Sequence, residues 1–80
     1  MAISAQISIY PLRQERLSPA IEAVRGALAA HGLQPEVGSM STVVTGTVED
    51  VFAALQEAFS QAATTGHVVM TVTVSNACPV

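Results

Sequence analysis

Alternation of apolar and polar residues predicts a strand near each end of the chain. From Ile3 to Tyr10 every second residue is apolar, which is typical of a strand with one buried face. Pro11 should end this strand because proline cannot donate to a sheet ladder. Residues 67–75 repeat the alternation around four large apolar positions. The polar positions that would share the opposite face are Ser4, Gln6, Ser8, Tyr10, Thr71, Thr73 and Ser75.

Two stretches have the spacing of amphipathic helices. The first should begin at Ser18-Pro19, a capping hydroxyl followed by a proline at the first helical position, and end near Gly32. The second should begin after Thr47 as cap, with Asp50 placed for a capping box. Its predicted apolar stripe is Val51, Phe52, Leu55, Ala58, Phe59 and Ala62.

Two short strands, roughly 34–39 and 42–47, fit between the helices with a tight turn over 38–41. The order βαββαβ predicts an α+β fold, the ferredoxin-like plait, in which a four-stranded antiparallel sheet carries both helices on one face. Residues 1–80 should form one domain. The pattern leaves two registers open for the third strand. Its uncovered face carries either Ser41, Val43 and Thr45 or Thr42, Val44 and Gly46.

Composition narrows the classes of function. The chain is 50% hydrophobic and only 11% charged, with no lysine and a net charge of −3. Nucleic-acid binding is excluded on this basis, because phosphates are held by clustered Lys and Arg. No apolar run is long enough for a membrane span and no secretory leader is recognisable, so we expect a cytoplasmic protein. Low charge in so small a chain predicts a homodimer or homotetramer, with contacts through the polar sheet face and an edge strand.

Candidate chemistry lies mainly on the uncovered sheet face, which has small hydrogen-bonding groups and no charge. Such a face suits an uncharged polar ligand or a second copy, although β-propensity alone also favours Thr and Ser. His31 and His67 are interpreted as structural, and Cys78 as a plain thiol. Arg13 and Arg16 belong to a loop that is solvated or holds an anion. We expect no catalysis, no metal and no cofactor.

Four segments resemble the YkoF-type family of thiamine/hydroxymethylpyrimidine-binding proteins. They are residues 5–12, 39–46, 48–55 and 66–79, and the last is the most specific, because its valine-rich strand ends in Ser75-Asn76-Ala77-Cys78-Pro79. The resemblance implies a ferredoxin-like unit that binds the pyrimidine against its sheet, without catalysis, in assemblies of several units. Some members carry two units in one chain. This chain has one, so a homodimer is the natural substitute.

The resemblance also implies a ligand and a role. The ligand would be thiamine or its hydroxymethylpyrimidine moiety, bound in support of uptake or salvage, with a transporter of thiamine precursors as a candidate partner. Uncharged donors and acceptors suit an aminopyrimidine, and Tyr10 could stack on its ring. The expected ligand-binding residues are Gln6, Ser8, Tyr10, Ser39, Ser41, Thr42, Thr73, Ser75 and Asn76. The alternative is a ligand-free oligomerisation or interaction module of the same fold.

Overall fold

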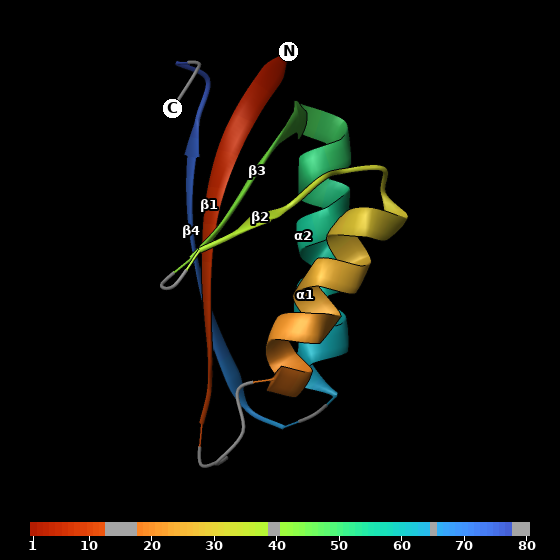
Figure 1. Cartoon of the computed structure of the whole chain (residues 1–80), viewed down its shortest axis with the longest axis vertical. Helices are drawn as coiled ribbons and strands as arrows, with labels where there is room; N and C mark the ends of the chain where they lie inside the picture. Colours follow the sequence, from red (N-terminus) through yellow and green to blue (C-terminus); the bar gives the residue numbers. More distant parts are fainter. Residues whose placement is uncertain (13–17, 39–40, 65, 78–80) are drawn as a thin grey trace.

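The computed structural model describes residues 1–12, 18–38, 41–64 and 66–77, with Ser18 described by its backbone only. Ser39 and Cys78 therefore lie outside the described residues. The elements in chain order are β1 (Ala2–Pro11), α1 (Ser18–Ala30), β2 (Glu36–Val37), β3 (Thr42–Thr47), α2 (Val48–Ala63) and β4 (Val68–Ser75) (Figure 1).

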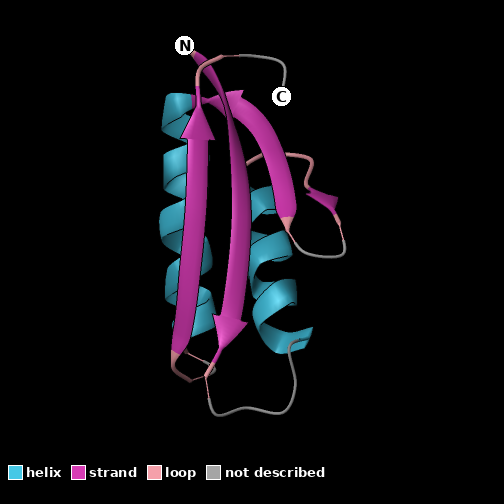
Figure 2. Ribbon diagram, turned by 90° about the vertical axis from the view of Figure 1, so that its left-hand side faces the viewer, coloured by secondary structure: helices cyan, strands magenta, loops and turns pink. Residues whose placement is uncertain are grey.

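The strands form one antiparallel sheet in the order β2-β3-β1-β4. Figure 2 shows both helices on the same side of this sheet, which leaves its other side uncovered. The predicted ferredoxin-like plait is confirmed. In the described part of the chain, none of the helices has both the length and the apolar character needed to cross a membrane.

The pairing of β1 with β3 resolves the register that the sequence left open. Gln6 is opposite Val43, and Ile7 is opposite Thr42. Directly opposed residues of an antiparallel pair point to the same side of the sheet. Because Ile7 is buried in the core, Thr42 lies on the helix-covered side, and Val43 lies on the uncovered side with Gln6.

The core lies between the sheet and the helices. It combines large side chains of β1 with alanines of both helices, and small residues let the two helices approach the sheet closely. Its buried members are Ile3, Ala5, Ile7, Val24, Ala27, Leu28, Leu33, Val44, Val51, Ala54, Leu55 and Ala58. The polar residues of the uncovered face are not part of this core.

The limits of both helices lie close to the predicted ones, and the predicted cap of α2 is confirmed. α1 ends at Ala30, and Gly32 adopts the left-handed conformation at φ 77°. The Thr47 side chain accepts a hydrogen bond of 3.1 Å from the Asp50 backbone N–H at the start of α2. The predicted apolar stripe of α2 is wrong in one respect, since Phe52 and Phe59 are 51% and 45% exposed.

Candidate functional site

The uncovered face of the sheet consists of short cross-strand rows. Ser4 lies between Thr45 and Ser75, and the next row places Gln6 between Val43 and Thr73. Farther along β1, Ser8 is opposite Thr71 and Tyr10 is opposite Val69. Glu36 extends the Gln6 row onto β2, because it is opposite Val43. Among the described strand residues of this face, Glu36 is the charged one.

A small hollow lies over β1 between its two neighbours, and we call it the Gln6 hollow. Its volume is about 190 Å³, and β1, β3 and β4 all contribute to it. It is lined by Ser4, Ala5, Gln6, Val43, Thr73 and Ser75. Three of the expected ligand-binding residues, Gln6, Thr73 and Ser75, therefore meet in one place. They supply an amide and two hydroxyls, which both donate and accept hydrogen bonds.

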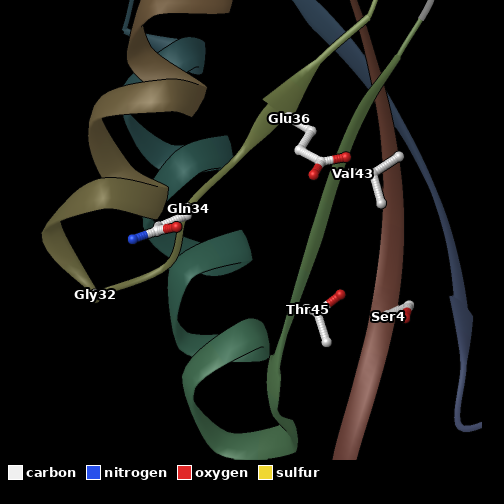
Figure 3. Close-up of a pocket in the computed structure, with 6 residues that line it drawn as sticks. All are labelled: Ser4, Gly32, Gln34, Glu36, Val43 and Thr45. Carbon is white, nitrogen blue, oxygen red and sulfur yellow. The ribbon is translucent and has the colours of Figure 1, made fainter. Parts of the chain in front are cut away.

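A second, larger hollow lies beside the first, and we call it the Glu36 hollow. Its volume is about 470 Å³, and its described lining is Ser4, Gly32, Gln34, Glu36, Val43 and Thr45. Figure 3 shows the Glu36 carboxylate directed from β2 toward Val43 on β3. The two hollows share Ser4 and Val43, so they adjoin on the same face.

One hydrogen bond orients the central amide of the face. Gln6 Nε2 donates to Ser41 Oγ at 3.1 Å, although the two residues are far apart in sequence. This contact joins Ser41 at the start of the β3 region to the Gln6 row. A primary amide has two N–H donors and one carbonyl acceptor, so an amide fixed in this way can recognise a ligand edge that both donates and accepts.

A local hydrogen bond holds the backbone just after β4. The Ala77 backbone N–H donates to Ser75 Oγ at 2.9 Å, so this hydroxyl is held as an acceptor and keeps its O–H proton for a further bond. Asn76 follows the strand and is exposed, outside the described lining of both hollows. Its expected contact with ligand stays a prediction.

Thr42 requires a correction. It was expected among the ligand-binding residues, but it is 8% exposed and lies on the helix-covered side, opposite Ile7. Adjacent strand residues point to opposite faces of a sheet. Of the two registers that the sequence left open, the structure has the one that places Val43, and not Thr42, on the uncovered face.

Ser8 and Tyr10 lie away from the Gln6 hollow. Tyr10 is four positions from Gln6 on the same strand, a separation of about 13 Å along an extended chain. Tyr10 is 53% exposed and lies opposite Val69. A ring bound in the Gln6 hollow would therefore lie too far from Tyr10 to stack on its side chain.

Sequence reasoning missed the residues that complete the two hollows. Ser4 was placed on the correct face but not in the site, although it lies between both hollows. Glu36 was missed because a strand of two residues has no period from which a face can be read. Within residues 1–12, 18–38, 41–64 and 66–77, no three His, Cys, Asp or Glu side chains are grouped as they would be around a metal ion.

Comparison with known proteins assigns the chain to a family. The model of the YKOF-related family matches residues 2–80, and the chain belongs to this family. No curated protein matches the chain.

Solved structures of the same fold come from distant organisms. A hypothetical protein of Methanocaldococcus jannascii superposes with a TM-score of 0.84 at 23% identity, covering 94% of this chain and 79% of that one. A Thermotoga maritima protein provisionally assigned to thiamine biosynthesis or salvage has a TM-score of 0.81 at 19% identity, covering 94% and 83%. A Streptococcus pneumoniae protein has a TM-score of 0.83 at 24% identity, covering 94% and 86%. At these identities the likeness concerns the fold.

Proposed function

We propose that this protein binds thiamine or its hydroxymethylpyrimidine moiety at the Gln6 hollow, without catalysis, in support of thiamine uptake or salvage. The observation that carries the proposal is the convergence of Gln6, Thr73 and Ser75 on one uncharged hollow of the uncovered face. Membership of the YKOF-related family and the role provisionally assigned to the Thermotoga maritima neighbour support it.

The chemistry of the hollow suits an aminopyrimidine. Such a ring has an exocyclic amine that donates and ring nitrogens that accept, and the amide of Gln6 offers the complementary pair. At about 190 Å³ the hollow is smaller than a usual site for a drug-sized molecule, so it would hold one ring and leave the rest of the ligand outside. Val43 supplies an apolar contact for one face of that ring, whereas the Ala5 side chain is buried in the core on the other side of the sheet.

The absence of catalysis is part of the proposal. The described lining of the Gln6 hollow includes hydroxyls but no histidine, cysteine or carboxylate that could act as a base toward them. Binding would therefore be reversible, and ligand recovered after incubation should be chemically unchanged.

Calorimetric titration tests the proposal. We expect thiamine and free hydroxymethylpyrimidine to bind, and Gln6→Ala to weaken both by about tenfold through the loss of directed hydrogen bonds. Gln56→Ala is the matched control, because Gln56 is an exposed glutamine of α2 on the helical layer, and it should leave both affinities unchanged. Absence of binding at millimolar ligand would overturn the proposal.

The same variant separates the proposal from the alternative of a ligand-free interaction module. If the uncovered face is only an interface between copies, Gln6→Ala should disturb assembly, and wild-type protein should bind neither compound. If the face is a ligand site, Gln6→Ala should lose ligand while sedimentation of the protein is unchanged.

A further inference from the structure

The Glu36 hollow has a property that the pyrimidine site does not explain. It adjoins the Gln6 hollow, is more than twice its volume, and contains a carboxylate directed over the uncovered face (Figure 3). A hydroxymethylpyrimidine alone would occupy the Gln6 hollow and leave this carboxylate without a use.

We propose that the Glu36 hollow holds a cationic ring joined to the pyrimidine, so that the protein selects thiamine over both the free pyrimidine and the thiamine phosphates. This inference rests on the proposed function. In thiamine one methylene group links the aminopyrimidine to a thiazolium ring of fixed positive charge. A ligand of that kind needs an uncharged subsite and an anionic subsite side by side.

The spacing of the two subsites agrees with such a ligand. Glu36, Val43 and Gln6 lie opposite one another on three neighbouring strands. Two strand spacings, about 10 Å, therefore separate the backbones of Glu36 and Gln6. The Glu36 side chain extends into this interval, toward Val43, which both hollows share. The charge thus lies beside the pyrimidine subsite.

The charges near Glu36 favour a cationic guest. In the described part of the chain the ion pairs are Arg25 with Glu22 and His31 with Glu57, and Glu36 takes part in neither. The remaining polar groups of the hollow, from Ser4, Gln34 and Thr45, are uncharged. A phosphate added to the ligand would bring negative charge toward the same carboxylate, and like charges in proximity cost binding free energy.

Titration of a charge-neutral variant with three ligands tests this proposal. For the wild-type protein we expect thiamine to bind more tightly than hydroxymethylpyrimidine and than thiamine diphosphate. Glu36→Gln, which keeps the shape of the side chain, should weaken thiamine binding about fivefold and leave the pyrimidine unchanged. The thiamine advantage should also shrink at about 0.5 M salt, where the Debye length is only a few ångströms.

Glu49→Gln is the matched control, because it removes the same charge from an exposed position in the first turn of α2, on the helix side of the sheet. It should leave all three affinities unchanged. Equal binding of thiamine by wild-type and Glu36→Gln protein would overturn the cation subsite while the pyrimidine site stands. Failure of every ligand to bind the wild-type protein would overturn the proposed function and this inference with it.

Discussion

Gly46 on β3 lies against Leu33, in the segment that follows α1. A Cβ built at this position would be 2.6 Å from Leu33 Cδ2 and 3.4 Å from Val51 Cγ2, and both neighbours are buried. We expect Gly46→Ala to lower the free energy of unfolding by about 1–3 kcal/mol, since extra volume in a packed core forces side chains from their rotamers. Urea denaturation followed by circular dichroism measures the change.

Gly26→Ala provides the control for this substitution. Gly26 lies inside α1, and a Cβ at this position would have no atom of another residue within 4 Å beyond its own helix backbone and chain neighbours, so the same added methyl group meets open space. Alanine is the better helix former by roughly 0.5–1 kcal/mol, so this variant should be slightly more stable than wild type. Destabilisation by both variants would show that the effect at Gly46 does not come from the contact with Leu33.

The sequence was sufficient to assign some single residues to a face of the sheet, but not others. Alternation along residues 3–10 and 68–75 was long enough to assign Gln6, Thr73 and Ser75 to the uncovered face, and the structure confirms that face. Around residues 41–46 two faces were equally plausible, since both mix Thr or Ser with Val. Only the pairing with Ile7 and Gln6 decides that Thr42 belongs to the helix-covered side.

At the scale of elements, the start of α2 depends on one hydroxyl. β3 ends at Thr47 and α2 begins at the next residue, so no loop lies between them. Thr47→Ala removes the acceptor for the Asp50 N–H and should cost about 1 kcal/mol of stability. Thr47→Ser keeps the hydroxyl and should recover most of the loss. Thermal denaturation of the two variants provides the comparison, and equal stability of both would contradict a capping role.

The elements themselves were predictable to different degrees. Both helices have a 3.6-residue period and limits that agree with the sequence, and α2 has the predicted cap at Thr47. β2 was expected over 34–39 but spans Glu36–Val37, because Pro35 has no N–H to donate and Gly38 already turns the chain, donating to the Ser41 carbonyl at 2.8 Å. The exposure of Phe52 and Phe59 was not predictable from α2 alone, because it depends on how the helix packs against the rest of the molecule.

At the scale of the whole molecule, the two edges of the sheet differ. β2 is an edge of two residues, whereas β4 is an edge of eight residues without a charge or a proline. Proteins usually protect long edge strands with Lys, Pro or a bulge. α2 packs against β4, and Phe52, Phe59 and Val74 are each at least 40% exposed. These features favour the β4 edge for the self-association expected from the composition.

Antiparallel pairing of β4 with β4 of a second copy would be self-complementary about a two-fold axis and would leave both uncovered faces open to ligand. A charge at this edge should therefore abolish the dimer. We expect Val74→Lys to sediment as a monomer at low micromolar concentration while wild-type protein sediments as a dimer.

Val37→Lys is the matched control, because Val37 is also exposed on the helix-facing side but lies on the β2 edge, and it should remain dimeric. A monomeric wild type that still binds thiamine would show that one plait suffices. Dissociation by Val37→Lys instead of Val74→Lys would move the contact to β2, where Glu36 lies, and would make the cation subsite part of the interface.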